Sequence, residues 1–184
     1  MDNIELGRRY DGIIERCVAI FEAKTKDYGP TWLFFRDESF VDQLWIKARR
    51  IRTLEENGDD SLVGEGRADE YLGIVNYGII MLMRMQNPEL FPSPGEVVAD
   101  TEAYYKLHLS DMKQAYLMER KNHDYGAAWT EMHLHSITDQ IIVKLFRMKN
   151  IISTGGKLLA SEGLDAQISD IINYSIFALL KMSM

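Results

Sequence analysis

The chain carries one string of residues twice, 97 positions apart. Lys-x-x-Asp-Tyr-Gly-x-x-Trp occupies positions 24–32 and again positions 121–129. When the chain is shifted by 97 residues, positions 24–85 and 121–182 align without a gap, and 20 of the 62 pairs are identical. Self-similarity at a fixed offset over this length is the signature of a repeated structural unit. The chain is therefore a tandem duplication, and its fold must hold two equivalent halves.

Both halves have the hydrophobic spacing of helices, with apolar residues three and four positions apart. One stripe comprises Phe40, Leu44, Trp45, Ala48, Ile51 and Leu54, matched by Ile137, Ile141, Ile142, Leu145, Met148 and Ile151. A second comprises Tyr71, Ile74, Val75, Ile79 and Leu82, matched by Ile168, Ile171, Ile172, Ile176 and Leu179. A leading helix is marked by Tyr10, Ile13, Ile14, Cys17, Val18 and Phe21, and less clearly by Leu109, Met112 and Tyr116. We expect an all-α bundle of about six main helices, three in each half.

A proline-rich segment separates the halves. Three of the four prolines lie within Asn87–Glu96, and proline blocks the continuation of a helix. We therefore expect a first helical repeat over 1–86, a linker over 87–100 and a second repeat over 101–184. Because a three-helix unit has little core of its own, the two repeats should pack as one body about a pseudo-two-fold axis.

The composition limits the classes of partner. The longest apolar run, Ile79–Met83, is far shorter than the ~20 residues that span a bilayer. The N-terminal residues lack the pattern of a secretory signal, and the single cysteine, Cys17, cannot form an internal disulfide, so a cytoplasmic protein is expected. A net charge of −7 argues against a broad nucleic-acid surface. A small anionic ligand held by a few cations stays open.

Two Lys-x-x-Arg pairs are identical between the repeats although the apolar residues around them differ. Lys47 and Arg50 correspond to Lys144 and Arg147. A spacing of three places both cations of a pair on one helical face. They either extend over the rim of the core with their charges in water or bind phosphate groups.

The polar residues before the pairs suggest helix caps. Ser39 and Ser136 each stand three residues before an aspartate, Asp42 and Asp139. This spacing resembles a capping box with aspartate in place of glutamate, so we expect both pairs to close the N-terminus of a helix.

Acidic residues near the third helical segment are candidates for a metal site. Glu65 and Glu162 each precede a glycine, where a carboxylate either complements the helix dipole or binds a hard cation such as Mg²⁺. Asp69 and Glu70 have no acidic counterparts in the second copy, and Asp170 has none in the first. The two halves therefore cannot contribute to a metal site in the same way.

Two further repeated features allow a structural and a binding interpretation. Asn76 and Asn173 lie within apolar stretches, and a buried asparagine must find hydrogen-bond partners, on a neighbouring helix or on the edge of a base. Gly29 and Gly126 are expected to end the leading helices or to take a left-handed turn conformation. Trp32 and Trp129 follow this turn and either cover the core or stack on a base.

The order of these features resembles a bacterial and phage domain family of unknown function that is associated with nucleotide modification. The order is an Asp-Tyr-Gly-x-x-Trp turn, a helix with Lys-x-x-Arg, and a helix with an acidic start that ends in Asn-Tyr. The resemblance covers 24–85 and 121–182. More distantly, the chain is similar to the MazG-like all-α nucleoside triphosphate pyrophosphohydrolases.

The second resemblance implies Mg²⁺-assisted cleavage of a nucleoside triphosphate to monophosphate and pyrophosphate. Those enzymes hold the metal with Glu-x-x-Glu on one helix and Glu-x-x-Asp on the next. This chain has Lys-x-x-Arg in place of the first motif, and keeps only Glu70-x-x-Gly73 and Gln167-x-x-Asp170 of the second. The resemblance implies Glu70 and Asp170 as catalytic residues. The candidate Mg²⁺ ligands are Glu65, Asp69, Glu70, Glu162 and Asp170.

The leading hypothesis is a nucleotide-handling bundle, either a pyrophosphohydrolase or a non-catalytic nucleotide-binding protein. The expected substrate-binding residues are Lys47, Arg50, Lys144, Arg147, Trp32, Trp129, Asn76 and Asn173. Bundles of this kind are commonly built from two-fold-related units, which also leaves a homodimer open. The rival hypothesis is a helical interaction protein whose repeated polar residues are caps and rim. Gathering of the cation pairs and turn motifs around one cleft favours the first hypothesis, and dispersal favours the second.

Overall fold

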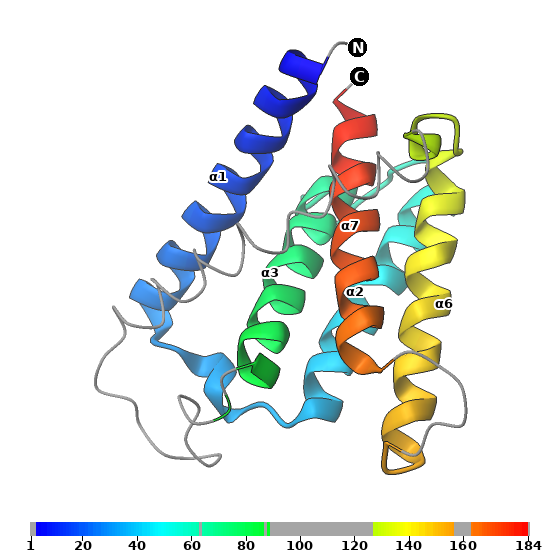
Figure 1. Cartoon of the computed structure of the whole chain (residues 1–184). Coiled ribbons are helices and arrows are strands. Elements are labelled where there is room, and N and C mark those ends of the chain that lie inside the picture. The colour runs from blue at the N-terminus through cyan, green and yellow to red at the C-terminus, as the bar shows by residue number, and fades with distance from the viewer. Residues whose placement is uncertain (1–2, 63, 87, 89–126, 157–162, 184) are drawn as a thin grey trace.

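The expected all-α fold is confirmed. The computed structural model describes residues 3–62, 64–86, 88, 127–156 and 163–183, which contain helices and turns and no strand (Figure 1). The α-helices are α1 (Asn3–Tyr28), α2 (Asp37–Glu56), α3 (Arg67–Gln86), α6 (Leu134–Ser153) and α7 (Leu164–Met182), and the 3-10 helices are η1 (Thr31–Phe34) and η3 (Ala128–Thr130). The second leading helix, expected near residues 109–116, lies outside the described residues, as does nearly all of the linker.

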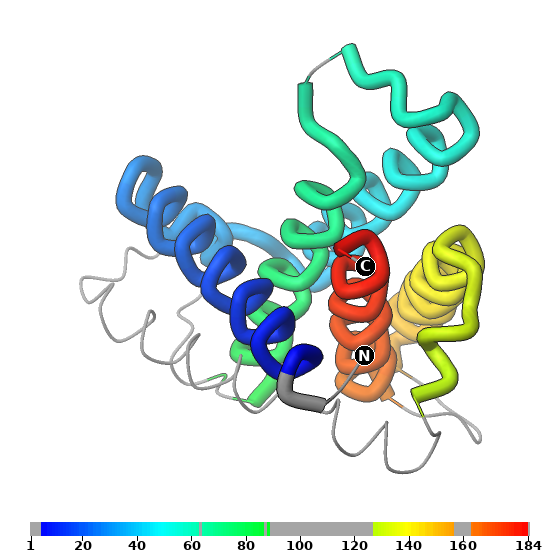
Figure 2. Tube along the Cα trace, turned by 90° about the horizontal axis from the view of Figure 1, so that it is seen from above, coloured from blue at the N-terminus to red at the C-terminus, as the bar shows by residue number. Residues whose placement is uncertain are grey.

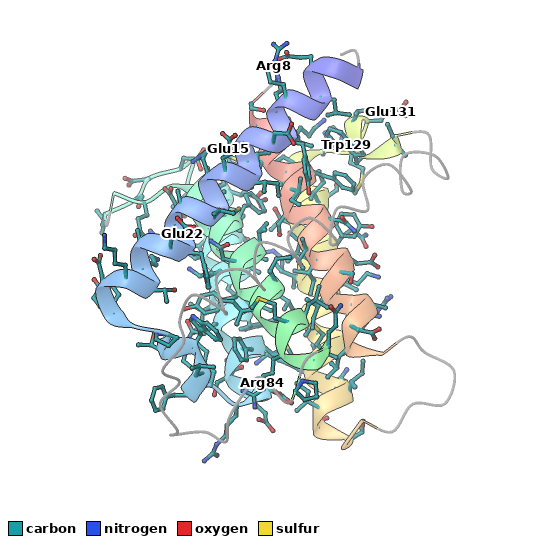
Figure 3. The ribbon with its side chains drawn as sticks, turned by 60° about the vertical axis from the view of Figure 1, so that its left-hand side comes forward. Arg8, Glu15, Glu22, Arg84, Trp129 and Glu131 are labelled. Carbon is teal, nitrogen blue, oxygen red and sulfur yellow. The ribbon has the colours of Figure 1, made fainter. Side chains whose placement is uncertain are left out.

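Helix α1 buries one stripe and exposes the opposite face. Tyr10, Ile13, Cys17 and Phe21 are buried, whereas the charged residues of the outer face are exposed. Arg8, Glu15 and Glu22 mark this outer face in Figure 3. The helix ends at Tyr28 because the next residue, Gly29, has a φ of +72°, a left-handed conformation that glycine adopts without strain.

Helices α2 and α6 are the equivalent second helices of the two repeats, and their predicted apolar stripes are buried, with Trp45 half-buried. The expected capping boxes are wrong. The N-cap residues are Arg36 and His133, and neither makes a side-chain capping bond. The helices begin earlier than the serines suggested, so Ser39 and Ser136 lie inside the first turn.

The two aspartates of those expected caps instead join the repeats. Asp42 on α2 pairs with Lys149 on α6, and Asp139 on α6 pairs with Arg52 on α2. Position 42 corresponds to 139 and position 52 to 149 in the alignment. Exchanging the two repeats therefore turns one contact into the other. Such reciprocity is the contact pattern of a two-fold axis. The repeats therefore pack as a pseudo-symmetric pair, with α2 antiparallel to α6.

Helices α3 and α7 form the centre of the bundle and bury apolar residues on most of their surface. They cross closely at Gly78, where an added Cβ would lie 2.8 Å from Cγ1 of Ile172. Helices α2 and α6 pack against this central pair on one side, and α1 crosses it on another (Figure 2). No described helix combines the length and the apolar character needed to cross a membrane.

Candidate functional site

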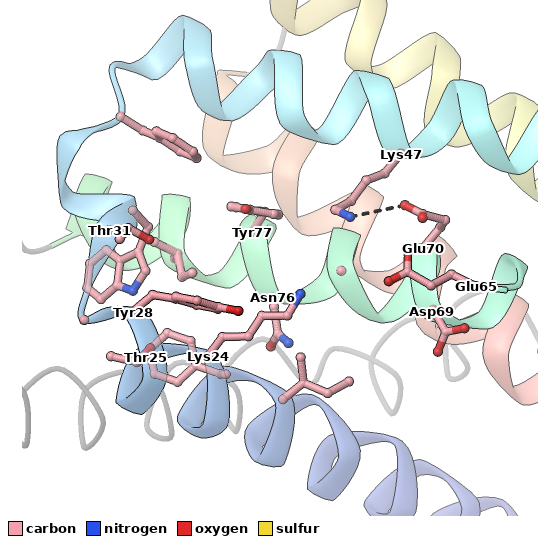
Figure 4. Close-up of a pocket in the computed structure, with 17 residues that line it drawn as sticks. Lys24, Thr25, Tyr28, Thr31, Lys47, Glu65, Asp69, Glu70, Asn76 and Tyr77 are labelled. Atoms are coloured by element: carbon pink, nitrogen blue, oxygen red, sulfur yellow. Dashed lines mark hydrogen bonds and ion pairs between the residues drawn. The ribbon is translucent and has the colours of Figure 1, made fainter. Parts of the chain in front are cut away.

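A cavity of about 470 Å³ lies in the first repeat, between the C-terminal half of α1, η1, α2 and α3 (Figure 4). The first Lys-x-x-Asp-Tyr-Gly-x-x-Trp string contributes Lys24, Tyr28, Gly29 and Trp32 to its lining. Cavities of this volume are typical of small-molecule sites. The first copy of the string therefore does more than end a helix, because it builds one wall of this cavity.

One end of the cavity is aromatic. Tyr28, Trp32, Phe35 and Tyr77 line this end, and the rings of Phe35 and Tyr77 stack with centroids 6.1 Å apart. Burial raises the pKa of Tyr77, so its phenol stays protonated and can donate a hydrogen bond. Arg84 fixes the wall by donating from Nη1 to the carbonyl oxygen of Phe35 at 2.7 Å.

Two lysines line the cavity between its aromatic end and the start of α3. Lys24 comes from α1 and Lys47 from α2, and Lys47 Nζ lies 5.9 Å from the centre of the Tyr77 ring. Lys24 is exposed and forms no ion pair with any described residue. Lys47 is half-buried, and its Nζ lies 3.2 Å from Oε2 of Glu70. The cavity thus holds one unpaired cation and one paired cation.

Asn76 presents an acceptor to the same space. It is 7% exposed and lines the cavity, and its Nδ2 donates to the carbonyl oxygen of Cys17 on α1 at 3.0 Å. Its Oδ1 has no hydrogen-bond partner among the described residues. A buried acceptor without a partner is costly, and a bound hydroxyl or N–H group would remove that cost.

The other end of the cavity is acidic. Glu65, Asp69 and Glu70 line it at the start of α3, about 10 Å along the helix axis from Tyr77 at 1.5 Å per residue. Glu70 is buried and forms ion pairs with both Lys47 and Arg50. Asp69 Oδ2 accepts the backbone N–H of Gly66 at 3.0 Å, a capping contact at the start of α3.

Arg50 holds the loop before α3 against α2. Its Nη1 lies 3.1 Å from Oε2 of Glu65, and its Nη2 donates to the carbonyl oxygen of the same residue at 3.1 Å. Burial lowers the pKa of Arg50, but the hydrogen bonds and charges of Glu65 and Glu70 outweigh burial and raise it. Arg50 therefore stays charged, and it does not line the cavity.

The second repeat arranges the equivalent residues differently. Lys144 Nζ lies 2.5 Å from Oδ2 of Asp170, and Arg147 is exposed. Asn173 and Gln167 are buried, and neither the Asn173 Nδ2 nor the Gln167 Oε1 has a hydrogen-bond partner among the described residues. Glu162 lies outside the described residues, as does the first part of the second turn motif.

The two tryptophans are buried and lie at opposite ends of the bundle. Trp32 is packed against Phe21, with ring centroids 6.1 Å apart, and also lines the cavity. Trp129 stacks on Phe177 at 5.0 Å with an angle of 2° between the rings, at the end of the bundle opposite Arg84 (Figure 3). Trp32 and Trp129 therefore do not share one cleft, whereas Trp32 and Lys47 line the same cavity.

The four described carboxylates expected to bind Mg²⁺ do not form a metal site with one another as the structure arranges them. No group of three histidine, cysteine, aspartate or glutamate residues is placed to hold a metal ion within the described part of the chain. Glu70 and Glu65 face cations, Asp69 caps a helix, and Asp170 pairs with a lysine of its own repeat. Asp170, the candidate ligand from the second repeat, therefore does not join the carboxylates at the start of α3.

Sequence reasoning missed three residues of the cavity as candidates for binding. Lys24, Tyr28 and Tyr77 are identical in both repeats, and that identity was the available signal. Lys24 and Tyr28 belong to the turn motif. Within this motif, the sequence predicts a ligand contact for Trp32 alone.

The comparisons with known proteins give a family and no close relative. The family model described as "Nucleotide modification associated domain 1" matches residues 24–85 and 121–182. No curated protein and no solved structure matches the chain. The two matched segments coincide with the repeats found from the sequence and together cover more than half of it. The chain therefore belongs to the Nucleotide modification associated domain 1 family and carries this domain as a tandem pair.

Proposed function

We propose that the cavity of the first repeat binds a nucleoside phosphate. The observation that carries this proposal is the combination of an aromatic end with two lysines in one cavity. A base would stack against Tyr28 or Tyr77, and its phosphate would bind to Lys24 and Lys47. The association of the family with nucleotide modification supports a ligand of this class.

Charge favours a ligand that carries its negative groups near the lysines. Lys24 has no ion pair with a described residue, so binding a phosphate breaks no ion pair within the described part of the chain. Glu70 remains paired with Arg50 when Lys47 turns toward a ligand. A phosphate can therefore enter without leaving a buried carboxylate uncompensated, which would otherwise cost several kcal/mol.

Hydrolysis to monophosphate and pyrophosphate stays a prediction from the resemblance to the pyrophosphohydrolases. Glu65, Asp69 and Glu70 line the same cavity as the lysines, which places acids near the proposed phosphate site. Because these carboxylates do not form a metal site with one another as arranged, we derive no metal-dependent step from them.

The test is a thermal-shift screen against ribo- and deoxyribonucleoside mono-, di- and triphosphates, with and without Mg²⁺. At least one nucleotide should raise the melting temperature in a concentration-dependent manner. Lys24→Ala should reduce that shift, whereas Lys26→Ala, an exposed lysine of the same helix that does not line the cavity, should preserve it. A screen in which no nucleotide stabilises the protein would favour the rival hypothesis of an interaction protein.

A further inference from the structure

We propose that the chain binds one nucleotide, in the first repeat, and that the second repeat is a structural half whose lysine is held by an aspartate of the neighbouring helix. This inference rests on the proposed function and goes beyond it, because a tandem pair of identical motifs would otherwise predict two sites. The residues that separate the halves are Gly73 and Glu70 in the first repeat, and Asp170 and Gln167 in the second.

Gly73 creates the space through which Lys47 reaches the cavity. A Cβ added at Gly73 would lie 2.8 Å from Cε of Lys47 and 3.0 Å from its Nζ. The lysine side chain therefore lies across the bare backbone of α3, and both residues line the cavity. Any side chain at position 73 would displace Lys47 or take its place.

The second repeat has an acid at the equivalent position. Asp170 corresponds to Gly73, and its Oδ2 lies 2.5 Å from Nζ of Lys144. The side chain of Lys144 is 12% exposed, against 22% for Lys47. The partner of the retained lysine has thus moved by three residues, about one helical turn, and it now fills the space that glycine leaves open in the first repeat.

The ion pairs Lys47–Glu70 and Lys144–Asp170 also differ in how easily the lysine can separate from its carboxylate. Glu70 is shared between Lys47 and Arg50, so it keeps a cation when Lys47 binds a ligand. In the second repeat the position of Glu70 is Gln167, and Arg147 is exposed. Among the described residues of the second repeat, no carboxylate is seen to join the lysine and the arginine in this way, and Asp170 joins Lys144 on α6 to α7.

Titration calorimetry of the full chain, with the nucleotide that gives the largest thermal shift, tests the inference. We expect one site per chain. Lys47→Ala should weaken binding by about 10-fold or more, the effect of losing one charge-assisted hydrogen bond. The matched variant Lys144→Ala should change affinity by less than about 2-fold.

A transplant of the second-repeat residues provides the sharper test. Glu70→Gln alone should retain binding, because Lys47 is then free to bind phosphate. Adding Gly73→Asp should recapture Lys47 and reduce binding by about 10-fold or more. The melting temperature without ligand should stay close to that of the wild type, because the double variant keeps a lysine–carboxylate pair at this position. If Lys144→Ala does not fold, Lys144→Met with Asp170→Asn replaces it as the second-repeat variant.

Three results would overturn the inference: two sites per chain, equal weakening by the two lysine variants, or retained binding in the Glu70→Gln, Gly73→Asp protein. Each of these leaves nucleotide binding itself intact. Absence of binding by the wild-type chain would instead overturn the proposed function, and this inference with it.

Discussion

Glu70 is the residue that sets the charge of the candidate site. Its buried carboxylate forms ion pairs with both Lys47 and Arg50, and it competes with a ligand for the lysine. Glu70→Gln removes this competition and one negative charge from the cavity wall. We expect nucleotide affinity to rise by about 10-fold or more in calorimetry, because a hydrogen bond to a charged group is worth about 1.5–3 kcal/mol net.

The same variant separates binding from catalysis. If Glu70 acts on the nucleotide as the resemblance implies, Glu70→Gln abolishes Mg²⁺-dependent pyrophosphate release while it retains binding. Asp165→Asn, a change in the second repeat, is the control and should leave most of any release in place. Weaker nucleotide binding in Glu70→Gln would show that the carboxylate supports the ligand rather than competing with it.

Cys17 gives the protein a pH dependence that does not involve the ligand. Its thiol is fully buried, and burial raises its pKa from 9.0 to about 12. Above pH 9 the unfolded chain loses a proton that the folded chain keeps, so the free energy of unfolding falls as pH rises. The slope for one group approaches about 1.4 kcal/mol per pH unit.

Urea unfolding of the wild type and Cys17→Ala between about pH 8 and about pH 10 measures this slope. The wild type should lose stability through this range, and the variant should lose less. Tyr71, whose pKa burial also raises, adds a slope only at higher pH. Equal slopes in the two proteins would show that the thiol does not control this dependence.

At the scale of the helix, the packing of α3 against α7 depends on Gly78. Alanine usually stabilises a helix relative to glycine by about 1 kcal/mol. At Gly78, however, the new Cβ would lie 2.8 Å from Ile172, and overpacking costs about 1–3 kcal/mol. We expect Gly78→Ala to lower the free energy of unfolding by up to about 2 kcal/mol, the overpacking cost less the helix gain.

Gly12 on α1 is the matched control, because nothing lies within 4 Å of the position of its Cβ. Gly12→Ala should raise stability by up to about 1 kcal/mol. Ile172→Ala should reduce the effect of Gly78→Ala in a double-mutant cycle. Stabilisation by both alanines to the same extent would contradict the close crossing of α3 and α7.

The elements could be predicted well from the sequence, because an apolar stripe records which helix face is buried. The stripes of α1, α2, α3, α6 and α7 all face the core. The caps could not be predicted in the same way. A capping box would satisfy Ser-x-x-Asp locally, but Asp42 and Asp139 instead pair with cations on the opposite repeat. Local spacing does not reveal a cation that another helix supplies.

The candidate site could be predicted only in part. Lys47 was identifiable because the repeat kept Lys-x-x-Arg while its apolar neighbours changed. Which residues share a cavity depends on how α1 crosses α3, and the contact between Asn76 and Cys17 that accompanies this crossing has no signature in the periodicity. The alignment already shows Gly73 in the first repeat and Asp170 in the second. That this difference changes the surroundings of Lys47 and Lys144 became clear only from the positions of the two lysines.

For the molecule as a whole, the reciprocal ion pairs test the pseudo-two-fold packing. Asp42→Lys should lower the free energy of unfolding by about 1 kcal/mol or less, because this surface pair is partly screened by water. Adding Lys149→Asp restores opposite charges and should recover most of the loss. Additive losses in the double variant, measured by urea unfolding, would show that the two residues do not meet.

Nucleotide binding in the first repeat is tested most directly by a crystal structure of the protein with the nucleotide that stabilises it most. We predict electron density for one nucleotide per chain in the cavity between α1 and α3, with its base against Tyr28 or Tyr77. A phosphate oxygen should lie within hydrogen-bond distance, about 2.7–3.2 Å, of Nζ of Lys24 or Lys47. A nucleotide bound in the second repeat, or outside the cavity on the surface of the bundle, would contradict the assignment of this cavity as the nucleotide site.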